Sequence, residues 1–119
     1  AARARDSSQI ILFTHHPLFG QSPQEPDSYW NIPLERRMPV LELLRTYGVS
    51  AVFAGHWHRN NYAFDGAMQM VTTGSVGYPL GDDPSGYRAV TVFDNLIEHE
   101  YRALAGYKTI EHVSDSRRK

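Results

Sequence analysis

The chain has 119 residues, 41% of them hydrophobic and 21% charged, which is the balance of one globular domain with a packed core. Its 12 basic and 13 acidic side chains give a net charge of −1 without a basic stripe, which argues against nucleic acid as a partner. No apolar run is long enough to span a membrane, and the absence of cysteine excludes disulfides and thiolate metal sites. Any metal must therefore be held by histidine, carboxylate or amide groups.

The first residues predict the end of a helix. Residues 1–5 (AARAR) lack an initiating methionine and are strong helix formers with no capping residue before them. We therefore expect this helix to begin outside the chain, and the chain to be the C-terminal part of a longer protein. No secretory leader is recognisable, which favours a cytoplasmic location.

A strand, a loop and a helix are predicted next. Residues 9–14 (QIILFT) form a continuous apolar run with β-branched and aromatic side chains, which predicts a buried strand. The segment 20–33 is rich in Pro, Ser and Gln and predicts a loop. Apolar residues of 34–47 recur at helical spacing, and Gly48 stands where a left-handed C-terminal cap belongs. Pro39 conflicts with an unbroken helix, so the helix either begins near it or kinks there.

Residues 49–54 (VSAVFA) predict a second buried strand. The order strand, helix, strand implies a parallel pair joined by a right-handed crossover. We expect a turn at Asn60-Asn61, and Asp94-Asn95 is typical of a tight hairpin. Three further strands are predicted over 68–73, 88–93 and 96–101.

Two polar segments complete the organisation. The cluster 81–86 (GDDPSG) is typical of a turn, although its acidic pair offers a cation an alternative contact. Residues 114–119 form a charged tail that we expect to be frayed. Because there is no repeat, low-complexity block or linker, residues 1–113 are predicted to form one portion of a single domain.

Four of the six histidines stand directly after the two strands predicted to be parallel. His15 and His16 follow the first strand, and His56 and His58 follow the second. Parallel strands end at the same edge of a sheet, so we expect all four imidazoles in one neighbourhood, where open α/β sheets bind ligands. In extended backbone the side chains of His56 and His58 would also point the same way. This pattern suits one metal ion or two adjacent ions.

Each histidine also has an ordinary interpretation, as a solvated or hydrogen-bonded residue at the end of a strand. His99 in a predicted hairpin strand and His112 near the tail fit that interpretation. Imidazole is the commonest metal ligand among side chains, but spacing alone leaves both interpretations of the clustered histidines open.

Two motifs at these positions resemble those of the calcineurin-like metallophosphoesterases. Residues 13–19 (FTHHPLF) are similar to the H-x-P segment of that family, and residues 55–58 (GHWH) to its G-H-x-H motif. The resemblance covers nearly all of residues 1–104. Three further segments resemble the branch of cytosolic serine/threonine-type phosphatases with a single such domain: YWN at 29–31, GHWHRN at 55–60 and LGDDP at 80–84.

The resemblance implies an α/β (α+β) fold. In that family two mixed sheets lie between outer helices in a four-layer αββα sandwich. This chain would supply the C-terminal half, with about five strands in a mixed sheet and one long helix. Its remaining apolar face would be covered by the missing N-terminal half, which we expect to be its structural partner.

The resemblance also implies a binuclear metal centre. His15 and His56 would bind one ion and His58 the other, and Mn, Fe or Zn suit such ligands. His15 is preferred to His16 because the family places its ligand two residues before the proline. The substrate would then be contacted by pocket residues, for which the candidates are His16, Tyr29, Trp30, Asn31 and Asn60. Alternatively, the aromatic members of this set pack the loop on itself.

This chain departs from the family in lacking the D-x-H, G-D-x-x-D and G-N-H-[DE] motifs, which should precede the histidines. Gly81-Asp82 has no later Asp in register and follows them. The chain therefore has no bridging carboxylate and no general-acid histidine, so we expect it to be inactive alone. The predicted function of the parent protein is the hydrolysis of phosphate esters, in small molecules or phosphoproteins. The alternatives are a truncated metal-binding or structural fragment without activity, and a phosphodiesterase of the same superfamily.

Overall fold

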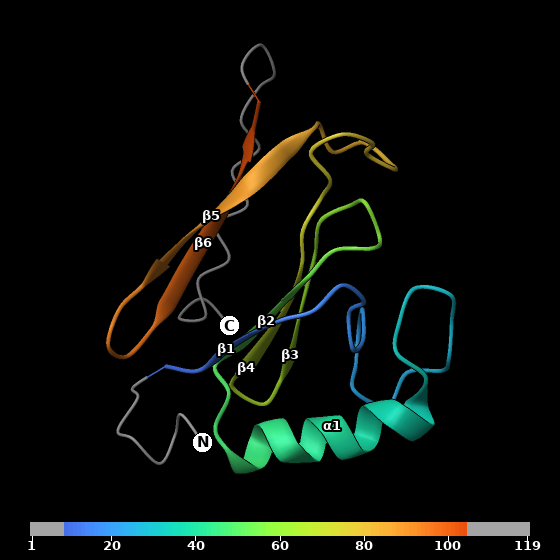
Figure 1. The fold of residues 1–119 in the computed structure, drawn as a ribbon, viewed down its shortest axis with the longest axis vertical. Helices are drawn as coiled ribbons and strands as arrows, with labels where there is room; N and C mark the ends of the chain where they lie inside the picture. Colours follow the sequence, from blue (N-terminus) through green and yellow to red (C-terminus); the bar gives the residue numbers. More distant parts are fainter. Residues whose placement is uncertain (1–8, 105–119) are drawn as a thin grey trace.

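In the computed structural model, which describes residues 9–104, strands and one helix are arranged in layers (Figure 1). In chain order the elements of this described part are β1 (Ile11–Phe13), α1 (Leu34–Thr46), β2 (Ala51–Ala54), β3 (Asn61–Asp65), β4 (Met68–Thr72), β5 (Gly86–Val92) and β6 (Ile97–Ala103). The predictions made for residues 1–5, His112 and 114–119 lie outside the described residues.

Four of the strands form a mixed sheet in the order β1-β2-β4-β3, and β5 and β6 form a second, antiparallel sheet. β1 pairs with β2 in parallel, with Ile11 opposite Ala51, and β2 pairs with β4 in parallel, with Val52 opposite Met70. β3 runs antiparallel to β4 at the other edge. The predicted parallel pair with its intervening helix is therefore confirmed, as is the mixed α/β class.

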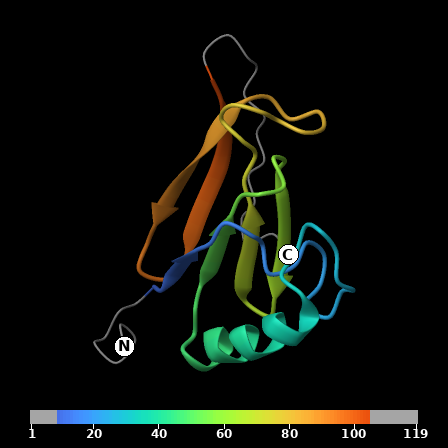
Figure 2. The same ribbon diagram turned by 45° about the vertical axis from the view of Figure 1, so that its right-hand side comes forward.

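The mixed sheet is covered on both faces (Figures 1 and 2). On one face Leu41 of α1 joins Val52 and Met70 in a buried cluster. On the other face Ile97 of β6 packs with Phe53. Neighbouring residues of β2 thus point to opposite layers, as the alternation of a strand requires. A strand buried on both faces reads as a continuous apolar run, which is why β2 was predictable.

The helix begins at Leu34, at the start of the predicted range 34–47, and continues through Pro39 to Thr46. Of the two alternatives that Pro39 left open, a helix that begins near Pro39 is therefore wrong. Pro39 has no amide hydrogen to donate to the carbonyl of Glu35. Because Glu35 is exposed, water can donate to that carbonyl instead. Gly48 has a φ of 63° and forms the expected left-handed cap.

The sequence pattern did not reveal β3. The turn expected at Asn60-Asn61 is wrong in its second residue, because Asn61 opens β3 and pairs with Thr72 of β4. β3 is an edge strand in which only Ala63 is buried, so its alternation is weak. The chain instead reverses at Gly66, whose φ of 59° makes the β3–β4 turn.

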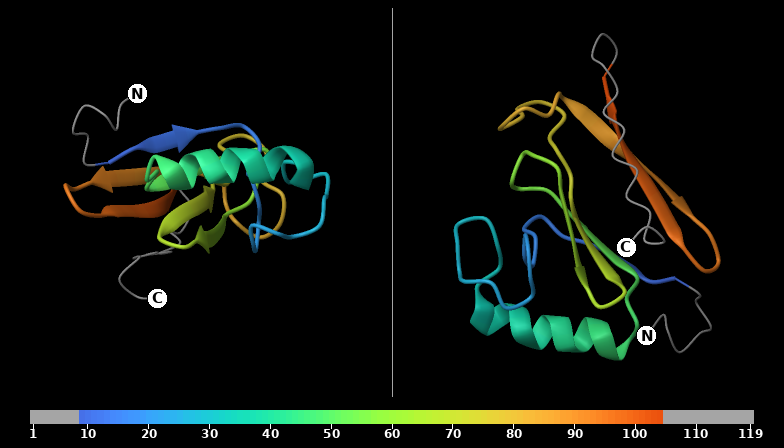
Figure 3. Two further views of the ribbon diagram at one scale, coloured as in Figure 1. Left: turned by 90° about the horizontal axis from the view of Figure 1, so that it is seen from below. Right: turned by 180° about the vertical axis from the view of Figure 1, so that it is seen from behind.

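Large apolar side chains remain exposed along β1 and β5. Phe13 is 74% exposed at the end of β1, which forms the other edge of the mixed sheet (Figure 3). A cavity of about 360 Å³ separates it from Tyr87 and Val90 of β5. These side chains leave an apolar surface, and the expectation that an N-terminal half covers it stays a prediction. Within residues 9–104, the helix is too short and too polar to cross a membrane.

Candidate metal centre

The carboxyl ends of β1 and β2 stay in register beyond the last strand residues. The amide of Thr14 donates to the carbonyl of Phe53 at 3.0 Å, and the amide of Gly55 donates to the carbonyl of His15 at 3.0 Å. These two bonds bring the segment after β1 against the segment after β2. They explain why histidines separated by some forty residues meet.

Three imidazoles gather at this edge. One ring nitrogen from each of His15, His16 and His56 lies within 4.8 Å of the other two. The ring centroid of His56 is 5.3 Å from that of His15 and 4.0 Å from that of His16. Desolvation lowers the pKa of His16, and the neighbouring His56 and His15 lower it further. The lowered pKa favours the neutral form of His16, which is the form of imidazole that binds metal ions.

The G-H-x-H segment is not extended. His56 has a φ of 64° and His58 a φ of 55°, so both lie in the left-handed region that non-glycine residues rarely adopt. The expectation that their side chains point the same way from extended backbone is therefore wrong. Each such residue costs about 1–3 kcal/mol, and strained backbone of this kind concentrates at functional sites.

One ring nitrogen of each of these two histidines, His56 and His58, forms a hydrogen bond to a backbone carbonyl. Nε2 of His56 donates to the carbonyl of Tyr29 at 3.1 Å, and Nδ1 of His58 donates to the carbonyl of Tyr78 at 2.7 Å. A carbonyl only accepts hydrogen bonds, so these two nitrogens carry the protons. Nδ1 of His56 and Nε2 of His58 are left as lone-pair donors, and a metal-binding histidine is typically fixed in this way.

The structure brings together His15 and His56, which the sequence placed on one ion, and adds His16 to them. His58 lies outside this three-histidine cluster, with its ring 6.3 Å from that of Tyr78. No carboxylate belongs to the cluster among residues 9–104. Three imidazoles fit part of a transition-metal site, and the donors are too few for two ions. The assignment of individual ligands stays a prediction.

Two of the predicted pocket residues lie against the cluster. The ring of Tyr29 is 5.1 Å from that of His56, and the ring of Trp30 is 5.7 Å from it. Tyr29 is 75% exposed, whereas Trp30 also lies beside Trp57, with 6.2 Å between ring centroids. Both aromatic side chains therefore border the histidines.

Asn31 is only 6% exposed and turns inward. Its Nδ2 donates to Oε1 of Glu25 at 2.8 Å, and its Oδ1 accepts from the amide of Ser28 at 3.0 Å. Desolvation raises the pKa of Glu25, but bonds from Asn31 and from three backbone amides outweigh it and hold the pKa below its usual value. Asn31 thus fixes the loop 20–33 from within.

Arg37 is a residue of the site that the motifs did not reveal. Its side chain is fully buried, and it donates to the carbonyls of Ile32 at 2.9 Å, Pro23 at 2.9 Å and Glu25 at 2.8 Å. It therefore fastens the loop 20–33 to α1. The available signal was its place on the apolar stripe of the helix, where a charged residue is unexpected.

Asn60 is held between the two sheets. Its Oδ1 accepts from the amide of Gly74 at 3.0 Å and from Nη2 of Arg88 at 2.5 Å. The backbone amide of Asn60 donates to Oδ2 of Asp83 at 2.9 Å. Asp83 of the 81–86 segment thus contributes to turn structure. Oδ1 of Asn60 is committed to protein contacts, whereas its Nδ2 is buried without a hydrogen-bond partner among the described residues.

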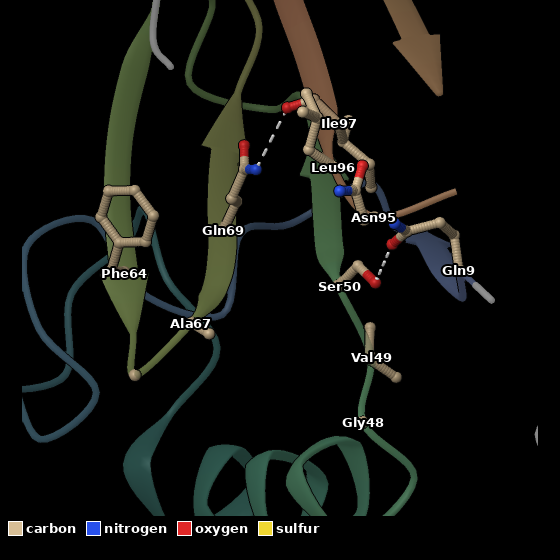
Figure 4. Close-up of a pocket in the computed structure, with 11 residues that line it drawn as sticks. Gln9, Gly48, Val49, Ser50, Phe64, Ala67, Gln69, Asn95, Leu96 and Ile97 are labelled. Atoms are coloured by element: carbon tan, nitrogen blue, oxygen red, sulfur yellow. Dashed lines mark hydrogen bonds between the residues drawn. The ribbon is translucent and has the colours of Figure 1, made fainter. Parts of the chain in front are cut away.

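A large cavity lies elsewhere. It has a volume of about 880 Å³ and opens at the amino end of β2, between Ser50, Gln69 and Ile97 (Figure 4). The residues that line it include no ionisable side chain. Its described lining therefore lacks a titratable acid or base that could activate Ser50, and the histidines at the carboxyl ends of β1 and β2 are the candidate site.

No family model and no solved structure matches the chain. Curated relatives do match it. The chain is 40% identical over 98 residues to the serine/threonine-protein phosphatase CPPED1 of Danio rerio, covering 82% of this chain and 32% of the relative. It is 37% identical over 103 residues to that of Mus musculus and 38% over 104 residues to that of Homo sapiens, covering 87% of this chain and 33% of each. The chain spans about a third of the length of these relatives.

Proposed function

Because this chain belongs to the calcineurin-like phosphoesterases, in the branch of serine/threonine-type phosphatases, we propose that its parent protein hydrolyses phosphate esters at a binuclear metal centre. The observation that supports this most strongly is the meeting of His15, His16 and His56 at the ends of two parallel strands. Imidazoles from separate segments have no structural need to converge there, whereas metal binding requires it.

His15 and His56 are the proposed ligands of one ion and His58 of the other. Mn, Fe and Zn all suit imidazole ligands. When bound, such ions supply Lewis acidity and lower the pKa of a coordinated water. The carbonyls of Tyr29 and Tyr78 fix the protons on His56 and His58, so that the free nitrogens are defined before any metal arrives.

The remaining ligands would come from the N-terminal half of the domain. Phe13 and Val90 border the apolar face that this half would cover. The lack of carboxylates in the three-histidine cluster supports the view that the chain alone is a metal-binding or structural fragment without activity. A phosphodiesterase of the same superfamily would share the same ligands and differ in its pocket.

The substrate proposed for the parent protein is a phosphate monoester, in a small molecule or in a phosphoprotein. The relatives are named as serine/threonine-protein phosphatases, which favours phosphoserine or phosphothreonine. His16, Tyr29 and Trp30 border the histidines and would contact the substrate. Asn31 and Asn60 would act on it through the loops that they hold.

The test measures phosphatase activity of the full-length protein on p-nitrophenyl phosphate with added Mn²⁺. His56→Ala is expected to lower kcat/KM by more than about a hundredfold, because outer contacts of a metal site already cost 10–100-fold. Thermal unfolding of the same samples controls for folding. A well-folded His56→Ala protein that keeps most of its activity would contradict the proposal. Turnover of bis(p-nitrophenyl) phosphate at a higher rate would favour the phosphodiesterase.

A further inference from the structure

We propose that Arg88 of β5, acting through Asn60, is a positioning residue for His58. It holds the loop 73–85, which joins β4 to β5, so that the carbonyl of Tyr78 meets Nδ1 of His58. The inference rests on the proposed function, in which the free Nε2 of His58 binds a metal ion. It assigns a role to Arg88, which the histidine motifs do not contain.

The guanidinium of Arg88 joins four parts of the chain. Its Nε donates to Oγ1 of Thr73 at 3.0 Å, its Nη1 to Nδ1 of His99 at 2.9 Å and its Nη2 to Oδ1 of Asn60 at 2.5 Å. Its charged carbon lies 5.7 Å from the centre of the Tyr101 ring. These contacts of Arg88, called the polar junction below, therefore connect β5 and β6 with the end of β4 and with Asn60, which follows the G-H-x-H segment 55–58.

Only an arginine satisfies these contacts together. Its planar fork offers five N–H donors, whereas a lysine ammonium is a point charge without that geometry. Burial lowers the pKa of Arg88 to about 10, so the group remains charged at neutral pH. Burial and the adjacent Arg88 lower the pKa of His99 to about 4, so His99 is neutral and its Nδ1 can accept.

Asn60 ties both ends of the loop 73–85 together. Its Oδ1 accepts from the amide of Gly74 near the start, and its backbone amide donates to Asp83 near the end. A Cβ at Gly74 would lie 3.0 Å from the hydroxyl of Tyr101 and 3.1 Å from Nδ2 of Asn60, so a larger residue would disturb this approach. Tyr101 adds a further bond, from its hydroxyl to the carbonyl of Pro84 at 2.6 Å.

The loop in turn holds His58 by its ring and by its backbone. The carbonyl of Tyr78 accepts from Nδ1 at 2.7 Å, and the amide of Leu80 donates to the carbonyl of His58 at 2.8 Å. The side chains of Val76 and Tyr78 are exposed, so apolar packing contributes little to the loop. Its shape therefore depends on the polar junction, and so does the ring of His58.

The tautomer of His58 reports this positioning directly. In the ¹⁵N-labelled chain without metal at pH 8, NMR of the ring nitrogens is expected to show the proton of His58 on Nδ1. An unrestrained imidazole prefers the proton on Nε2. Arg88→Met and Asn60→Ala are expected to lower the ratio of Nδ1–H to Nε2–H by about 2- to 10-fold, the value of one net hydrogen bond.

Arg102→Met is the matched control, since Arg102 lies on the same hairpin, is exposed and pairs with Glu100. It should leave the tautomer of His58 unchanged. His56 is an internal control in every spectrum, because its partner Tyr29 belongs to the other loop. A change at His58 with none at His56 separates positioning from general loss of structure.

If Arg88→Met does not fold, Tyr101→Phe removes the hydroxyl that donates to the carbonyls of Pro84 and Ser75 and should shift the tautomer of His58 in the same direction, by a smaller factor. The proposal is overturned if wild-type His58 carries its proton on Nε2, or if His58 keeps the Nδ1–H form in every folded variant. Because no metal or substrate is present, these results are independent of whether the parent protein proves to be a phosphatase.

Discussion

Two loops provide the carbonyls that orient the histidines, and they are held in different ways. The loop 20–33 gives the carbonyl of Tyr29 to His56 and is fixed by buried groups within itself and on the adjoining α1. The loop 73–85 gives the carbonyl of Tyr78 to His58 and is fixed by Arg88 from the second sheet. The contacts of His56 (the His56 side) and those of His58 (the His58 side) therefore depend on different parts of the fold. A substitution that disrupts one set of contacts should leave the other intact.

The largest separate effect is expected on the His56 side. Arg37→Met removes three hydrogen bonds to loop carbonyls and should lower the free energy of unfolding by about 3 kcal/mol, at about 1 kcal/mol for each bond. Urea unfolding measures the change, and Arg36→Met, on the exposed side of the same helix, is its control. The tautomer of His56 should change while that of His58 does not. Equal changes at both histidines would refute the independence of the loops.

Low pH should destabilise the part of the fold that holds His58, because His99 is buried beside Arg88. The pKa of His99 is about 4 in the folded chain against a usual 6.5, so between these values the unfolded chain binds more protons and stability falls as the pH falls. The full loss is about 3 kcal/mol at 1.36 kcal/mol per pH unit. His99→Gln keeps an acceptor for Arg88 without titrating, so its urea midpoint should change less between pH 7 and pH 4.5. An equally steep loss in His99→Gln would assign the acid sensitivity to other groups.

Glu25→Gln should have a smaller effect on the His56 side. The carboxylate of Glu25 accepts from the amides of Gly20 at 2.6 Å and Gln21 at 2.7 Å, and an amide side chain would turn a donor toward one of them. We expect a loss of about 1–2 kcal/mol, since these bonds are charge-assisted. Hydrogen exchange should become faster in the loop 20–33 and stay unchanged in the loop 73–85. Faster exchange in both loops would contradict the comparison.

The smallest effect is expected away from both loops. Arg45 pairs with Asp65 at 2.7 Å on the surface, where water and salt screen the interaction. Arg45→Ala should leave the midpoint of thermal unfolding and both histidine tautomers within experimental error of the wild type. A clear change in either tautomer would show that the site responds to remote substitutions without selectivity.

The sequence predicted the parts of the fold that local patterns encode. β1, α1, β2 and the β5–β6 hairpin follow from apolar periodicity and turn residues, and the parallel pair follows from their order. β3 was missed because its stability comes from pairing with β4, which its own residues signal weakly. The domain bounds 1–113 and the cytoplasmic location stay predictions.

The position of the candidate site could be predicted from the sequence, but its backbone conformation and supporting contacts could not. That histidines follow two parallel strands could be read from the chain, whereas the left-handed φ values of His56 and His58 are set by distant contacts. The roles of Arg37 and Arg88 could not be predicted, because their hydrogen-bond partners are backbone carbonyls and residues far along the chain. The participation of His16 likewise depends on the approach of His56, which no spacing rule specifies.

The most direct test of the central claim titrates Zn²⁺ into the ¹⁵N-labelled chain and follows each imidazole by NMR. If separate segments form one metal centre, the rings of His15 and His56 should respond together at the same Zn²⁺ concentration. His99, buried beside Arg88, should not respond. Independent responses of His15 and His56, or a response of only one of them, would contradict the account.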